Sequence, residues 1–211
     1  MGSRFSYGAV ATVVLVALLA GCASAPTPVG TPTVPWETHN KRVLDTQEWH
    51  LEGKMGYRGN GEGGSAWVDW RQTGASFEVH LSGPFGAGVT RLYGDDQGAV
   101  LSEAGHEDRI APTPGLLTAE LFGWTLPVEQ LRYWVRGVPD PQLPVSAMDL
   151  NVQGVLGYLQ QQGWELRFDD YRPTPIGILP GKILASRDST EAGVIRVTLV
   201  VKAWHLNSQR Y

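Results

Sequence analysis

Residues 195–203 read Ile-Arg-Val-Thr-Leu-Val-Val-Lys-Ala, and their pattern decides the fold. Apolar side chains occupy every second position, and the polar side chains of Arg196, Thr198 and Lys202 lie between them. Successive side chains of a β-strand point to opposite faces of the sheet. A period of two is therefore typical of a strand with one face buried and the other in water. The stretch predicts a half-buried β-strand.

Similar strand-like stretches recur along the chain, at 49–57, 66–71, 77–81, 89–93, 164–169 and 182–186. The sequences that separate them are typical of turns: Gly59-Asn60-Gly61, Thr73-Gly74, Gly94-Asp95-Asp96, Gln162-Gly163 and Ala192-Gly193. This spacing predicts a mainly β protein, built as an antiparallel sheet of hairpins. A sheet of that length tends to curl, so we expect an incomplete, half-open β-barrel.

Residues 113–137 interrupt the strands with a helical pattern. Leu116, Leu117 and Leu121 are expected on one face of a first helix that ends near Gly123. Pro127 suits the first turn of a second helix, which Gly137 and Pro139 end. The apolar face of this second helix is formed by Leu131, Trp134 and Val135. Two short helices inserted between strands predict a lid over one face of the curved sheet, with Leu117, Leu121, Leu131, Trp134 and Val135 as its apolar residues.

The N-terminus has the pattern of a secretory signal. Arg4 precedes an apolar run over residues 8–20, which ends in Leu19-Ala20-Gly21-Cys22. This ending resembles the bacterial lipobox, and the resemblance implies cleavage before Cys22 and lipidation of that residue, the only cysteine in the chain. The alternative is an ordinary signal peptide that leaves an unpaired thiol in an oxidising compartment. The residue after the lipidated cysteine is Ala23, and by resemblance to enteric lipoproteins it permits export to the outer membrane.

The remaining chain is expected to be one domain on a tether. Residues 1–21 form the signal peptide, residues 22–44 the lipidated N-terminus with a Pro/Thr-rich tether, and residues 45–211 the β domain. A weak helical pattern covers residues 36–48. Without the signal peptide the chain has 16 basic and 21 acidic side chains, a net charge of −5. This balance excludes a nucleic-acid partner and electrostatic capture by anionic lipids.

No sequence motif indicates catalysis, a cofactor or a metal site. Gly59–Gly64 matches the glycine pattern of dinucleotide sites, but a strand follows it where a helix is needed, so it predicts a hairpin tip. Gly177–Lys182 is one residue too short for a phosphate-binding loop. The histidines are scattered along the chain, at His39, His50, His80, His106 and His205. The carboxylates of Asp69, Asp95 and Asp96 are explained by a strand face and a turn. We therefore expect a protein that is not an enzyme.

The apolar residues suggest an interior that is either hollow or packed. The chain has 8 Trp, and large aromatic side chains line greasy cavities as well as cores. If the inner face encloses a hollow, the expected lining is Leu51, Met55, Phe77, Val79, Leu81, Trp164, Phe168 and Leu199. No charged groups converge there, so acyl chains are the natural occupant. A fully packed core agrees with the same pattern equally well.

The loop at residues 82–88 is the other unusual feature. It reads Ser-Gly-Pro-Phe-Gly-Ala-Gly, so Phe85 has few neighbouring side chains to pack against. Phe85 is either tucked under the sheet or exposed. On a protein held at a membrane, an exposed aromatic side chain could enter the bilayer interface.

Residues 45–206 resemble the LolB family of outer-membrane lipoprotein receptors. The segment that carries most of the resemblance is Leu131–Pro139, which is similar to the family's Leu-x-x-Trp-apolar-x-Gly-apolar-Pro pattern. Three further segments match in character: Trp49–Met55, Trp70–Gly74 and Pro84-Phe85-Gly86.

This resemblance implies an incomplete β-barrel with a helical lid and an apolar cavity. It also implies a monomer, anchored in the outer membrane and facing the periplasm, that accepts lipoproteins from the soluble carrier LolA. The receptor would bind their acyl chains and insert them into the inner leaflet of the outer membrane, with Pro84, Phe85 and Gly86 forming the membrane-insertion loop. The family often has Leu where this chain has Phe85. A structural envelope lipoprotein, or a carrier of another lipid with the same fold, is the alternative.

Overall fold

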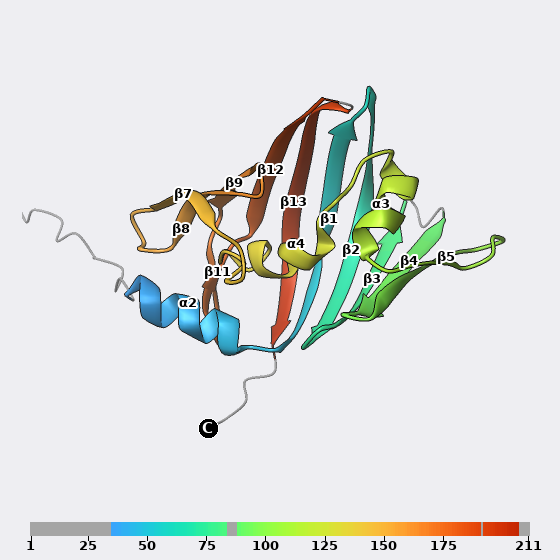
Figure 1. The fold of residues 1–211 in the computed structure, drawn as a ribbon. Helices are drawn as coiled ribbons and strands as arrows, with labels where there is room; N and C mark the ends of the chain where they lie inside the picture. Colours follow the sequence, from blue (N-terminus) through green and yellow to red (C-terminus); the bar gives the residue numbers. More distant parts are fainter. Residues whose placement is uncertain (1–34, 84–87, 191, 207–211) are drawn as a thin grey trace, which may run out of the picture. The chain divides into compact units, whose positions relative to one another are not determined.

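The computed structural model describes residues 35–83, 88–190 and 192–206 (Figure 1). Within them, an 11-stranded antiparallel sheet has the order β6-β5-β4-β3-β2-β1-β13-β12-β9-β8-β7. Its strands are β1 Glu48–Gly59, β2 Glu62–Thr73, β3 Ser76–Ser82, β4 Val89–Asp95, β5 Gly98–Glu103, β6 Arg109–Ala111, β7 Val145–Leu150, β8 Leu156–Gln161, β9 Trp164–Asp169, β12 Lys182–Ser189 and β13 Gly193–Leu206. The short strands β10 Arg172–Thr174 and β11 Gly177–Leu179 pair only with each other. Strands β6 and β7 are the two edges, so the sheet is open, and the prediction of a mainly β, half-open antiparallel architecture is confirmed.

The centre of the sheet is made from the two ends of the folded chain. Strand β13, which contains residues 195–203, pairs with β1 on one side and with β12 on the other. Strands β1 and β2 are joined by a two-residue turn at Asn60 and Gly61, whose φ angles are 53° and 75°. Positive φ at both central residues is typical of a type I′ hairpin turn. The glycine-rich stretch Gly59–Gly64 is therefore the predicted hairpin tip.

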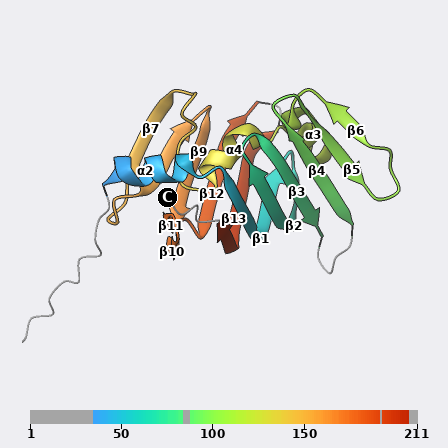
Figure 2. The ribbon, with the colours of Figure 1, turned by 90° about the horizontal axis from the view of Figure 1, so that it is seen from below.

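Two short helices follow β6, as the sequence predicts. Helix α3 (Pro114–Phe122) begins with proline in its first turn and ends at Gly123, whose φ of 73° suits glycine. Helix α4 (Val128–Trp134) comes next, and α3 packs against it and against β4, β5 and β6 (Figure 2). The expected apolar face of α3 is wrong at Leu116, which is 54% exposed while Leu117 is 1% exposed. Adjacent helical residues point about 100° apart, so only one of the two can face the sheet.

Helix α2 (Trp36–Asp45) belongs to the folded domain. Val43 is fully buried against Val138 and Leu179, and the Arg136 guanidinium donates hydrogen bonds to the carbonyl oxygens of Val43 (2.7 Å) and Thr46 (2.9 Å). Burial lowers the pKa of Arg136 to about 10, so the group remains a charged donor at neutral pH. The tether predicted for residues 22–44 therefore extends too far, because residues 36–44 are helical and pack on the domain.

The main core lies between the inner face of the sheet and helices α3 and α4. It contains the side chains of Leu51, Leu101, Leu159 and Trp164, each 1% exposed or less. Among the described residues, no helix has the length and apolar character needed to cross a membrane.

Candidate binding cavity

A cavity opens in the core where α3 and α4 cover the inner face of the sheet. Its lining is apolar apart from Thr118. The lining residues are Met55, Val68, Trp70, Val79, Leu81, Leu92, Thr118, Leu121, Phe122, Leu126, Val128, Leu131, Val135, Ile183, Ala185, Val197 and Leu199.

Strand register explains why these side chains converge. Trp70 pairs with Val79, and Val79 pairs with Leu92, so strands β2, β3 and β4 contribute one row of apolar side chains on the same face. Leu81 and Val68 form the next row. Where a strand contributes two lining residues they lie two positions apart, so the alternation in the sequence directly produces an apolar surface.

The hydroxyl of Thr118 is occupied within the protein. It lies 2.9 Å from the carbonyl oxygen of Gly115 and 3.2 Å from that of Leu126, and it accepts a hydrogen bond from the Leu126 N–H at 2.9 Å. None of the lining side chains is titratable. The cavity can therefore exclude water and contact an apolar group, but it supplies no acid, base or nucleophile.

The cavity has a volume of about 70 Å³. That is several times what one water needs, roughly 10–15 Å³, but well below the roughly 300–1,000 Å³ of a typical ligand site. The interior is thus mostly packed, with a small apolar hollow left under the helices.

The sequence-predicted lining residues divide into two groups. Met55, Val79, Leu81 and Leu199 line the cavity. Leu51, Phe77, Trp164 and Phe168 are buried in the same core but lie outside this lining.

The predicted lid residues divide in the same way. Leu121, Leu131 and Val135 line the cavity, whereas Leu117 and Trp134 are buried in the core beside it. Six further lining residues were not predicted, although they lie at the apolar positions of predicted strands: Val68, Trp70, Leu92, Ile183, Ala185 and Val197.

Cys22 and the predicted insertion loop of Pro84, Phe85 and Gly86 lie outside the described residues. Val89, at the start of β4 and just after this loop, is 48% exposed, and Trp67 on β2, the neighbour of β3, is 47% exposed. Cross-strand pairing connects Lys54, Trp67, Ser82 and Val89 in one row on the face opposite the cavity. The Lys54 ammonium lies 5.9 Å from the centre of the Trp67 ring. We call these four residues the outer row.

Comparison with known proteins places the chain among related sequences. The sequence model of one family, described as outer membrane lipoprotein LolB, matches residues 47–204. An outer-membrane lipoprotein LolB of Chromohalobacter salexigens is 38% identical over 198 residues, covering 93% of this chain and 89% of that protein. The one from Cellvibrio japonicus is 35% identical over 181 residues, covering 83% and 86%. Among solved structures, a LolA superfamily protein from Nitrosomonas europaea aligns with a TM-score of 0.47 at 9% identity, over 84% of this chain and 96% of that one.

Proposed function

The chain belongs to the LolB family of outer membrane lipoproteins, and on that premise we propose that it is a lipoprotein receptor. It accepts lipoproteins from the periplasmic carrier LolA by binding their acyl chains, and it inserts them into the inner leaflet of the outer membrane. It is itself anchored there through lipid on Cys22.

The observation that carries this proposal is the apolar cavity under α3 and α4. Each methylene moved from water into such a site gains about 0.8 kcal/mol, so an acyl chain is bound without any polar recognition. No lining side chain could drive lipoprotein transfer chemically. The direction of transfer must then come from the relative affinities of LolA, this protein and the membrane for the acyl chains. A tenfold preference at each step needs only about 1.4 kcal/mol.

Cargo binding requires the cavity to grow. A volume of about 70 Å³ is too small for a lipid anchor with more than one acyl chain. Because α3 and α4 form one wall and the sheet forms the other, outward movement of the two helices is the simplest way to enlarge it. The half-buried side chains of Leu121, Phe122 and Leu131 lie on the moving wall.

The outer row supports contact between this end of the sheet and the bilayer. Trp and Lys side chains are enriched where proteins meet the membrane interface, since each combines an apolar body with a polar tip. Trp67 lies on β2, next to β3, the strand that leads into residues 84–86, and Lys54 lies one strand further away, on β1. We propose that Phe85 enters the bilayer beside them when cargo is delivered.

A transfer assay tests the receptor function. LolA is loaded with a labelled lipoprotein and mixed with this protein, from which the signal peptide has been removed and in which Cys22→Ala prevents lipidation. Movement of the label to this protein is the expected result. If the label stays on LolA while the protein is folded, the proposal fails. Native mass spectrometry for bound lipid then decides between a structural lipoprotein and a carrier of another lipid.

The substitution Phe85→Glu separates acceptance from delivery. A carboxylate in place of the ring should leave folding and acceptance from LolA unchanged, because the cavity lining described above comes from the strands and from residues 118–135. Release of the label into liposomes should fall strongly, because a charged side chain is costly to place in the interface. Phe85→Leu is the matched control and should retain delivery. Normal delivery by Phe85→Glu would contradict the role proposed for the loop.

A further inference from the structure

A group of potential metal ligands lies on the outer face of the sheet, opposite the cavity. His50 and Glu52 are two positions apart in β1, so their side chains leave the strand on the same face. His205 in β13 pairs directly with His50 across the strand interface. Met55 lines the cavity and lies at an odd number of positions from His50 and Glu52, which places these two residues on the other side of the sheet.

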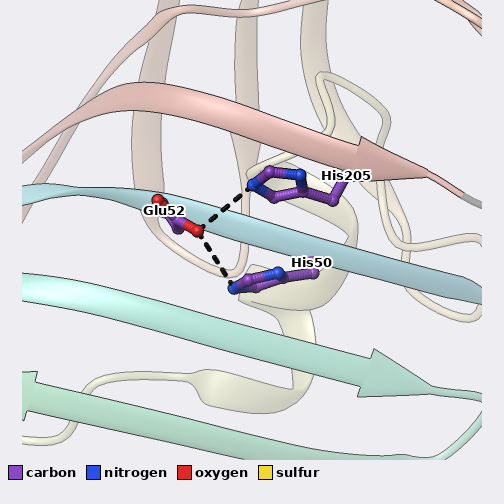
Figure 3. A group of neighbouring side chains, drawn as sticks. All are labelled: His50, Glu52 and His205. Carbon is purple, nitrogen blue, oxygen red and sulfur yellow. Dashed lines mark hydrogen bonds and ion pairs between the residues drawn. The ribbon is translucent and has the colours of Figure 1, made fainter.

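The side chains of these three residues converge (Figure 3). Glu52 Oε1 lies 3.2 Å from His205 Nε2 and 3.8 Å from His50 Nε2, and one potential ligand atom from each residue lies within 4.8 Å of the others. The two imidazole rings stack with centroids 4.8 Å apart. Asp69 in β2 is adjacent, with its Oδ2 atom 2.9 Å from His50 Nε2.

Two imidazoles and a carboxylate form a donor set that suits Zn²⁺. Zinc binds His nitrogen at about 2.0–2.1 Å and carboxylate oxygen at about 2.0–2.2 Å, so ligand atoms of a tetrahedral site are roughly 3.4 Å apart. The separations of 3.2 and 3.8 Å from Glu52 Oε1 are close to that value, and small side-chain rotations would suffice to surround an ion. We propose that His50, Glu52 and His205 bind a divalent transition-metal ion, with Zn²⁺ as the best fit.

The charges around the group favour a cation independently of that geometry. Glu52 and Asp69 are direct cross-strand partners, and like charges in that position destabilise a sheet. Arg71 supplies one positive charge beside them, with its Nη2 atom 3.8 Å from Asp69 Oδ1. A bound ion would offset the repulsion between the two carboxylates. Asp69 is placed to supply a fourth oxygen.

The site is open to solvent and joins distant parts of the chain. The side chains of His50, Glu52 and His205 are 21%, 48% and 55% exposed, so an ion can enter without any movement of the backbone. An ion held there would link β1 to β13, which are the first and last strands along the chain and lie side by side in the sheet. We therefore expect it to stabilise the fold, in a role separate from cargo binding. The sequence predicts no metal site because its histidines are scattered along the chain. Pairing of β1 with β13 nevertheless brings His50 and His205 together.

Metal titration of the mature, lipidated protein in detergent micelles tests the proposal. The metal-free protein is titrated with Zn²⁺ by calorimetry, and with Co²⁺ by visible absorption, which reports the coordination geometry. One ion should bind per chain. His50→Gln and His205→Gln should each weaken binding at least tenfold and abolish the Co²⁺ absorption.

His80→Gln is the matched control. His80 also lies on the outer face and contacts a carboxylate, with its Nε2 atom 2.7 Å from Glu78 Oε1, but it is outside the proposed site. This variant should bind like the unaltered protein. Saturating Zn²⁺ should raise the melting temperature of the unaltered protein and of His80→Gln, but not that of His205→Gln.

Three results would overturn the proposal. They are no Zn²⁺ binding at millimolar concentration, unaltered binding by His205→Gln, and equal weakening by His80→Gln. If His50→Gln fails to fold, His205→Gln decides the question alone. Its side chain is 55% exposed near the end of β13, so folding does not depend on it, and circular dichroism checks this.

Discussion

Gln161 is a polar side chain with no exposure to solvent, and its hydrogen bonds fix the end of α4. Its Oε1 atom accepts hydrogen bonds from the Trp134 indole N–H (2.8 Å) and the Asp140 backbone N–H (3.0 Å). Its amide nitrogen donates to the carbonyl oxygens of Asp140 and Leu143, both at 3.0 Å. A buried polar group with every partner in place defines one packing arrangement, because any other would leave it unsatisfied. Trp134 is thereby held as a fixed base of the wall that α4 contributes to the cavity.

Removing the Trp134 side chain should strongly destabilise the protein. The residue is 1% exposed, and its ring packs 6.4 Å from that of Trp164, centre to centre. Trp134→Ala should cost about 3–5 kcal/mol. Trp134→Phe keeps most of the packing and removes one hydrogen bond, so it should cost less, about 1–2 kcal/mol. Denaturant unfolding followed by circular dichroism measures both values. Equal stability of the unaltered protein and Trp134→Ala would contradict this account.

His39 makes the stability depend on pH. It is 3% exposed, and its Nε2 atom is buried without a hydrogen-bond partner among the described residues. Burial, and then the nearby Arg42, hold the pKa of His39 below its ordinary value. The unfolded chain therefore takes up a proton at a higher pH than the folded one. The contribution of neutral His39 to the free energy of unfolding is therefore fully present above about pH 6.5, the ordinary His pKa. It is lost as the pH falls below that value and through the lowered pKa of the folded protein.

Comparing the unaltered protein with His39→Leu isolates this contribution. The free energy of unfolding is measured by denaturant titration at about pH 7.5 and about pH 5.5, on either side of the ordinary His pKa. The unaltered protein should lose more stability between the two pH values than the variant does. The difference between the two losses is the test, since the variant also changes packing. Identical losses would show that His39 does not carry the effect.

At the scale of elements, the sequence predicts the central strands well and the edges poorly. Strands β1, β3, β9 and β13 have one buried and one solvated face, so their alternation is visible in the residue types. Strand β7 has none of its residues buried, and it carries no alternating pattern to detect. The same holds for α2, where only His39 and Val43 are buried, which is too few to distinguish a short helix from the end of a tether.

Alternation also explains why only part of the cavity lining could be predicted. It identifies which side chains face inward, and all eight residues predicted for the lining are buried or half-buried. It does not say which of them lie under α3 and α4. That depends on sheet curvature and on where the helices rest, and both arise from contacts between residues distant in sequence. Trp164 and Phe168 face the same side of the sheet as Leu199, yet only Leu199 lines the cavity.

The outer row makes a prediction for membrane contact. Trp67 is 47% exposed, and its transfer into the interface should contribute about 1.4 kcal/mol, a tenfold effect on binding. Trp67→Ser should therefore weaken binding of the Cys22→Ala protein to phospholipid vesicles about tenfold, as measured by co-sedimentation. Ile110→Ser is the matched control, because Ile110 is 79% exposed on the same face but lies on edge strand β6. A similar loss in both variants would indicate general hydrophobicity, and no loss in Trp67→Ser would remove Trp67 from the contact.

At the scale of the whole molecule, the fold combines a firm frame with a thin cover. The frame is the sheet, in which the long strands β1, β2 and β13 pair over most of their length. The cover is two short helices, of 9 and 7 residues, whose buried side chains contact the cavity or its surroundings. Extensive pairing of these central strands keeps their register fixed. Enlargement of the cavity therefore needs only the cover to move.

A larger side chain on the sheet that fills the cavity should block acceptance of lipoproteins without unfolding the protein. Ala185 lines the cavity from β12, and it is small enough for a leucine to extend into the hollow of about 70 Å³. Ala185→Leu should lower the amount of labelled lipoprotein taken from LolA at least tenfold, because the added side chain occupies the space that an acyl chain enters first. Its melting temperature should not fall, since an apolar side chain that fills a void adds contacts. Ala147→Leu, on edge strand β7 and away from the cavity, is the control and should accept cargo normally. If Ala185→Leu is folded and accepts cargo as well as the unaltered protein, the acyl chains bind elsewhere, and the cavity is only a packing defect of the core.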